Sequence, residues 1–216
     1  MPDYPITARN RVRRIPRRGR YDRKTVHAII DEALACHVAF IQARVPIVIP
    51  TLHARSGNSL LLHGAKTSRL MRHLAEGHPV SVAITILDGL VLARSVFHSA
   101  ANYRSVVIHG RGKLLVSTDD KLEALEAFAE HVAPGRWSDA RLPNRQELKA
   151  TSIVAIPIDS ASAKIRSGPP IDDELDYELP IWAGVIPFTL EPGTPQRDPR
   201  LRRGLKLPRY LKGYSR

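Results

Sequence analysis

Tight-turn signals between short β-branched segments most strongly constrain how this chain can fold. The strand-like segments HVAFI (37–41) and VPIVIPTLHA (45–54) are followed by the turn RSGNS (55–59), which returns the chain into LLLHG (60–64). Asp88-Gly89 joins VSVAITIL and GLVLARS, and dipeptides of this kind are typical of two-residue hairpins. YRSVVIHGRGKLLV and TSIVAIPIDSASAKI read as further strands. Strands joined by tight turns pair antiparallel, which argues against alternating βαβ units.

Three segments have the apolar spacing and end signals of helices. They are YDRKTVHAIIDEALAC (21–36), where Asp22 is placed to cap the start, KTSRLMRHLAEGHP (66–79), which Gly77 stops, and STDDKLEALEAFAEHVAPG (117–135), whose first hydroxyl residues, Ser117 and Thr118, are placed to cap it. Six or seven strands with about three helices predict a mainly β protein. We expect a small, mostly antiparallel barrel decorated by helices.

The net charge of +12 lies almost entirely at the two ends of the chain. Residues 1–20 contain seven Arg and one acid, and residues 197–216 contain eight Lys or Arg and one acid, which leaves 18 basic and 19 acidic residues between them. We therefore expect a nearly neutral domain over 21–190, a basic N-terminal arm over 1–20 and a basic, Pro- and Arg-rich C-terminal arm over 191–216. Such arms fit contacts to an acidic partner patch. They also have the charge for phosphate contacts, but no nucleic-acid-binding signature accompanies them.

Other composition features narrow the function classes. The apolar runs are too short to span a bilayer, and the Arg-rich start has no apolar signal region. The single cysteine, Cys36, excludes an internal disulfide and fits a reducing compartment, so we expect a cytoplasmic protein without a membrane partner. His53, His63 and His73 recur at intervals of ten, which is no recognised ligand spacing, and we expect no metal site.

Two polar clusters stand beside apolar strands. Lys66, Thr67, Ser68 and Arg69 follow LLLHG at the start of the second expected helix, where free backbone amides attract anions. The cluster predicts a phosphate site, or alternatively an ordinary Thr or Ser cap with solvated cations. In NYRSVVIHG, strand alternation sends Arg104 and Ser105 to opposite faces, so this strand borders a ligand or forms a polar barrel rim.

These segments together resemble a known family. RRGRYDRKTVHAIIDEALACHVAFI, LLLHGAKTSRLMR, DGLVLARSVFHSAANYRSVVIHGRGKLL and IWAGVIPF are similar to the flavin-nucleotide-binding split-barrel proteins, relatives of pyridoxamine 5′-phosphate oxidase and of the nitroimidazole-resistance reductases. The resemblance covers about Arg17 to Phe188. It implies a six-stranded antiparallel split barrel of the FMN-binding type, which forms a homodimer with FMN in two grooves at the subunit interface.

The resemblance also implies roles for the polar clusters. Lys66, Ser68 and Arg69, with Thr67 beside them, hold the FMN phosphate. His63 lies near the cofactor or substrate and is the candidate catalytic residue. Arg104 and Ser105 contact the flavin, and Trp182 approaches the ring system from the partner subunit.

The implied function is that of an FMN-dependent oxidoreductase, in particular a reductase, acting on a small molecule. The substrate-phosphate pattern of true pyridoxamine 5′-phosphate oxidases is missing near the C-terminus, which argues against vitamin B6 oxidation. Two alternatives stay open: a module that holds flavin, deazaflavin or haem without turnover, and a nucleic-acid-binding regulator that acts through the basic arms.

Overall fold

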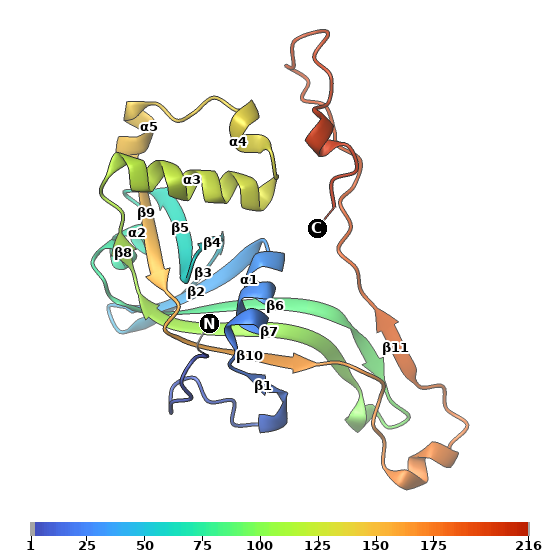
Figure 1. The fold of residues 1–216 in the computed structure, drawn as a ribbon. Helices are drawn as coiled ribbons and strands as arrows, with labels where there is room; N and C mark the ends of the chain where they lie inside the picture. The colour runs from blue at the N-terminus through green and yellow to red at the C-terminus, as the bar shows by residue number, and fades with distance from the viewer. Residues whose placement is uncertain (1–2, 216) are drawn as a thin grey trace.

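The computed structural model describes residues 3–215 and is built mainly from antiparallel strands (Figure 1). The strands are β1 (Gly19–Arg20), β2 (Ala35–Gln42), β3 (Val45–Leu52), β4 (Ala54–Ser56), β5 (Ser59–Ala65), β6 (Pro79–Leu92), β7 (Ala100–Arg111), β8 (Lys113–Leu114), β9 (Thr151–Pro157), β10 (Ser160–Arg166) and β11 (Gly184–Pro187). The larger sheet has the order β1-β10-β7-β6-β2-β3, with β11 also paired to β6, and the smaller has the order β4-β5-β9-β8. The sheets do not close on each other, so the expected antiparallel split-barrel fold is confirmed.

Most of the helices begin at a residue whose side chain caps them. The helices are α1 (Arg23–Glu32), α2 (Arg69–Ala75), α3 (Thr118–Val132), α4 (Arg136–Asp139) and α5 (Arg145–Ala150). Asp22 accepts a hydrogen bond from the Thr25 amide, and Ser117 accepts one from the Asp120 amide, so both expected caps are present. The short α4 and α5 were not predicted, because four to six residues carry too little apolar periodicity to read.

The core has two parts. In the larger, Val26, Ile29 and Ile30 of α1 pack with Phe40 of β2 and Ile108 of β7. In the smaller, the apolar side of α3 covers the outer face of the small sheet. Each fully buried aliphatic side chain contributes about 1.5–3 kcal/mol to folding, so the packing of α3 on Leu61 and Ile153 stabilises the small sheet.

The predicted hairpin at Asp88-Gly89 is wrong. β6 runs through both residues, and its register with β7 shifts between Leu87 and Gly89, so Asp88 forms a bulge. The residue after the bulge must be glycine for steric reasons: a Cβ there would lie 2.5 Å from the Ile186 carbonyl oxygen of the adjacent β11. A close strand approach therefore explains the glycine that the sequence suggested was a turn residue.

Two segments expected as single strands cross between the sheets. YRSVVIHGRGKLLV divides into β7 in the large sheet and β8 in the small one, and TSIVAIPIDSASAKI divides into β9 and β10 in the same way. The first crossing uses Gly112, where a Cβ would lie 2.4 Å from the Leu74 carbonyl oxygen of α2. These crossings tie the two sheets into one body.

Both chain ends contact this body. Tyr4, only 3% exposed, joins the large core, and its hydroxyl lies 2.9 Å from both His27 Nε2 and Asn58 Oδ1. The C-terminal segment leaves β11, extends away from the sheets and turns back near α3 and α4, where the Tyr210 hydroxyl donates to Asp139 (Figure 1). Within residues 3–215, no helix is long and apolar enough to cross a membrane.

Candidate functional site

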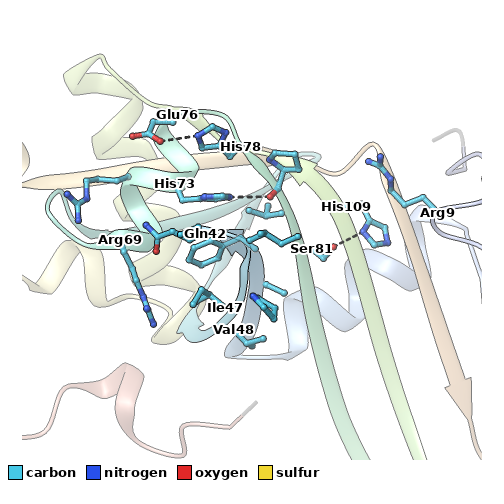
Figure 2. Close-up of a pocket in the computed structure, with 18 residues that line it drawn as sticks. Arg9, Gln42, Ile47, Val48, Arg69, His73, Glu76, His78, Ser81 and His109 are labelled. Atoms are coloured by element: carbon cyan, nitrogen blue, oxygen red, sulfur yellow. Dashed lines mark hydrogen bonds and ion pairs between the residues drawn. The ribbon is translucent and has the colours of Figure 1, made fainter.

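A cavity of about 810 Å³ opens where the β2–β3 hairpin meets α2 and the start of β6 (Figure 2). Arg69 lies at one end of it, and His109 and Arg9 lie at the other. Its volume is within the range of about 300–1,000 Å³ that is usual for cofactor pockets. Its lining residues are Arg9, Ala39, Phe40, Ile41, Gln42, Ala43, Pro46, Ile47, Val48, Arg69, Arg72, His73, Glu76, His78, Pro79, Val80, Ser81 and His109.

One wall of the cavity is apolar because of the β2–β3 hairpin. Its two-residue turn, Ala43-Arg44, has positive φ angles of 49° and 65°, which match the twist of the flanking strands. The hairpin thereby presents Phe40, Ile47 and Val48 to the cavity. A flat apolar surface of this kind excludes water from a bound aromatic molecule.

Two histidines meet above this wall because α2 stops at a glycine. Gly77 has φ of 72°, and its amide donates to the Leu74 carbonyl, while the His78 amide donates to the His73 carbonyl. His73 is 8% exposed, with its ring centroid 4.4 Å from that of Phe40 and 4.9 Å from that of His78. Its Nε2 lies 3.3 Å from the Pro79 carbonyl oxygen, long for a hydrogen bond.

A third histidine lies across the sheet. His109 of β7 is opposite Ser81 of β6, and its Nδ1 lies 2.9 Å from the Ser81 hydroxyl. Burial and then the nearby Arg9 charge lower the pKa of His109. His109 is therefore neutral near pH 7, with an imidazole that can accept a proton or bind a metal ion.

The cations of the site gather at its rim. Arg69 and Arg72 of α2 line the cavity on one side, and Arg9 of the N-terminal segment lines it on the other. The only carboxylate among the lining residues is Glu76, which lies 3.1 Å from His78 Nε2. The rim therefore favours a ligand that carries negative charge.

The start of α2 is organised differently from a simple phosphate cradle. Ser68 is the N-cap and accepts a hydrogen bond from the Met71 amide at 3.1 Å, as the capping alternative anticipated. The Lys66 amide donates to the Ala150 carbonyl. Of the four residues from Lys66 to Arg69, Arg69 lines the cavity, while the side chains of Lys66 and Thr67 are exposed beside it.

The other candidate residues lie elsewhere in the subunit. His63 of β5 packs edge-on against Phe128 of α3, with ring centroids 4.4 Å apart, and burial lowers the pKa of His63. Neither His63 nor Trp182 lines the large cavity. Trp182, 68% exposed, stands in the C-terminal segment, where its ring covers Gly184.

Arg104 and Ser105 bond to neighbouring strands and helices. Arg104 Nη2 lies 2.7 Å from Glu32 Oε1 and 2.7 Å from Asp88 Oδ1, and these two carboxylates raise the pKa of Arg104. The Ser105 hydroxyl donates to the Lys164 carbonyl at 3.2 Å. Within the single chain, the predicted site residues therefore lie in separate places rather than around one pocket.

The sequence did not predict that three histidines line one side of the cavity. His73 and His78 flank the stop of α2 in the segment HLAEGH, and His109 is 31 residues after His78. A helix stop between two histidines was the only local signal. Their proximity depends on the fold, because β6 carries the chain from His78 into the strand that pairs with β7.

Comparison with known proteins supports one family. The sequence matches the family model for pyridoxamine 5′-phosphate oxidase over residues 22–165. The structure of the flavocytochrome Anf3 from Azotobacter vinelandii is 36% identical, with 97% of each chain covered and a TM-score of 0.92. That of the FAD and haem binding protein from Mycobacterium smegmatis is 34% identical, with 91% of this chain and 96% of that chain covered and a TM-score of 0.87.

A search of curated protein sequences found no match. The family model nevertheless spans β2 to β9 and most of β10, the strands that surround the cavity and connect the two sheets. The likeness to the flavocytochrome from Azotobacter vinelandii covers 97% of this chain, so it includes most of both terminal segments as well. The chain therefore belongs to the pyridoxamine 5′-phosphate oxidase family and has its flavin-binding split-barrel fold.

Proposed function

We propose that this protein is a redox protein that binds both a flavin and haem, an oxidoreductase of the flavocytochrome kind acting on a small molecule. The observation that carries the proposal is the large cavity, where an apolar wall meets three histidines and three arginines. The likeness to a flavocytochrome and to an FAD and haem binding protein, over nearly the whole chain, supports it.

The cavity residues fit haem. Haem iron takes an imidazole as axial ligand, and a porphyrin needs an apolar surface for its ring and cations for its carboxylates. Phe40, Ile47 and Val48 supply the surface, and Arg72 and Arg9 supply the cations. His73 is the residue that would bind the haem iron, because it is the most buried histidine of the cavity and its contact with the Pro79 carbonyl is long enough to be exchanged.

The flavin site needs a second copy of the chain. Lys66, Ser68 and Arg69 lie at the start of α2, whereas Arg104 is on β7 and Trp182 is in the C-terminal segment. In a homodimer, the partner's Arg104 and the partner's Trp182 would reach the flavin whose phosphate the α2 residues would hold. The exposed apolar side chains of the C-terminal segment, among them Ile181, Trp182 and Phe188, favour such a contact between copies.

Together the two cofactors supply the redox chemistry, with two-electron exchange at the flavin and one-electron exchange at the haem. The protein residues position them and control protons. The β2–β3 hairpin excludes water, and the arginines at the rim hold anionic groups. The neutral His109, fixed by Ser81, can accept a proton from the substrate side, and burial lowers the pKa of His63 as well. The single thiol takes no part in this redox chemistry, because burial raises the pKa of Cys36 to about 12. One buried thiol also fits the proposed cytoplasmic location.

The absorption spectrum of the freshly purified protein tests this proposal. We expect a flavin band and a haem Soret band, with about one of each cofactor per subunit after extraction. Mass spectrometry of the released flavin distinguishes FAD from FMN. FAD is the flavin that the Mycobacterium smegmatis relative binds, and FMN is the flavin expected from the sequence. A colourless protein that takes up neither flavin nor haem would contradict the proposal.

A steady-state assay of turnover distinguishes an oxidoreductase from a protein that only holds its cofactors. Reduced nicotinamide and a panel of small acceptors should be consumed at steady state by the loaded protein. Loaded protein without turnover would indicate a module that only holds flavin, deazaflavin or haem. Retention on DNA that falls steeply with salt and depends on the basic ends would instead indicate a nucleic-acid regulator.

A further inference from the structure

Two segments far apart in the sequence meet at the end of the β6–β7 pair, away from the cofactor cavity. One is the short 3₁₀ helix Val96–His98 that connects the two strands, and the other is the 3₁₀ helix Glu174–Glu178 with the residue before it. They bring His98, Asp173 and Asp176 together, so that one imidazole nitrogen and two carboxylate oxygens all lie within 4.8 Å of one another.

The charges of this cluster are not balanced by basic side chains. The segment from 169 to 180 contains five acids and no Lys or Arg, although the whole chain has 33 basic residues. Among the residues that the structure describes, Asp173 forms an ion pair with His98, at 3.3 Å, and Asp176 forms none. Two neighbouring carboxylates repel each other, and a cation bound between them would relieve this repulsion.

The backbone that carries the cluster is held rigidly. The fully buried Asp172 accepts hydrogen bonds from the amides of Arg94 and Ser95, at 3.0 and 3.2 Å, and from the Arg94 guanidinium. That guanidinium also lies over the ring of Tyr177, 4.9 Å from its centroid. The Asp176 amide donates to the Asp173 carbonyl at 2.9 Å. The two segments are thus fixed to each other, and binding of an ion requires only rotation of side chains.

We propose that His98, Asp173 and Asp176 form a binding site for a divalent transition metal ion of the zinc class. One imidazole and two carboxylates suit such ions, with water in the remaining positions. Bonds of about 2.1 Å in a tetrahedral site place neighbouring ligand atoms about 3.4 Å apart. The His98 Nε2 to Asp173 Oδ2 distance of 3.3 Å already has this value, and Asp176 moves inward by a side-chain rotation.

The site would fasten the C-terminal segment to the strand pair. Asp173 and Asp176 lie a few residues before Trp182 and β11, and His98 belongs to the β6–β7 connection. A bound ion adds a cross-link between these segments beside the one that Asp172 provides. Metal binding would therefore hold the start of the C-terminal segment in place, independently of whether the cofactor cavity is filled.

Zinc titration of the protein as isolated, followed by calorimetry, tests the site directly. We expect one zinc ion bound by the wild type that His98→Ala and Asp176→Asn each weaken on the order of 100-fold, at least the loss caused by removing a second-shell partner. Glu174→Gln is the matched control, because it removes the same charge from the same segment but none of the three ligands. Equal weakening by Glu174→Gln, or unchanged binding in His98→Ala, would overturn the proposal.

Chymotrypsin cleavage gives a readout that does not depend on cofactors or activity. Zinc should slow cleavage after Tyr177 in the wild type and leave the rate in Asp176→Asn unchanged. If zinc leaves the wild-type rate unchanged, the proposal fails. Protection by a peptide of residues 197–212 instead of zinc would also overturn it, and would mark the acidic segment as a docking site for the basic C-terminal segment of another copy.

Discussion

At the scale of single residues, His73 links the fold to the proposed chemistry. We expect His73→Ala to lose most of the haem Soret absorption, because the buried imidazole that would bind the iron is removed. His37→Ala is the matched control, since His37 is exposed on β2 outside the cavity lining. Haem content per subunit is measured after extraction, with thermal unfolding checked alongside. A fully loaded His73→Ala protein would refute the assignment of this ligand.

A second prediction at the scale of single residues concerns the cations at the start of α2. Each of Lys66→Ala and Arg69→Ala removes one charge-assisted contact, so the binding free energy of the flavin should weaken by about 1.5–3 kcal/mol per contact. Fluorescence titration of flavin-free protein measures the dissociation constant. Lys24→Ala, on the exposed side of α1, provides the control. Unchanged affinity in both α2 variants would place the flavin phosphate elsewhere.

At the scale of elements, the attachment of β11 to β6 depends on one glycine. A methyl group on Gly89 would collide with the backbone of Ile186, so Gly89→Ala should cost about 1–3 kcal/mol and loosen β11. Gly193→Ala is the control, because a Cβ there meets no atom within 4 Å. Urea unfolding and the rate of proteolysis after Trp182 are the measurements. Equal stability of the two variants would mean that β11 shifts without cost.

The contact between the C-terminal segment and the β6–β7 connection should depend on pH. Burial acts to raise the pKa of Asp172, but hydrogen bonds from Ser95 and Arg94 outweigh it and lower that pKa. The ionised carboxylate therefore stabilises the fold above the unfolded pKa of about 3.9, and this contribution is lost as the pH falls through the lower folded value. Asp172→Asn should be less stable than wild type at pH 7, by urea unfolding. A difference that persists undiminished at the lowest accessible pH would contradict this account.

At the scale of the whole molecule, the proposed flavin site requires two copies of the chain. Light scattering after size exclusion should give a dimer for the full chain. Deletion of residues 179–216 removes Trp182, β11 and the segment beyond them, so it should weaken the dimer and release flavin while haem stays bound. Simultaneous loss of both cofactors would indicate a folding defect, which circular dichroism detects. A full chain that is monomeric yet retains flavin would refute a site shared between subunits.

Part of the candidate site could be read from the sequence, and part could not. Lys66 to Arg69 stand out locally, as cations and hydroxyls at a helix start, and the sequence located that start although Ser68 proved to be its cap. His73, His78 and His109 come together only because α2 stops at Gly77 and β6 then pairs with β7. Such pairing brings distant residues together, and no short segment contains that information.

Some features of the fold could likewise be predicted from the sequence, and others could not. The sequence by itself determined the class of fold, the three longer helices with the Asp22 and Ser117 caps, and the turn at Gly57, because each depends on hydrogen bonds or backbone angles within a few residues. Only the tertiary structure decided that Asp88-Gly89 is a bulge and that two long strands divide between sheets. Those outcomes follow from the close approach of β11 and α2, and the free energy of such non-local contacts overrides local turn and strand preferences.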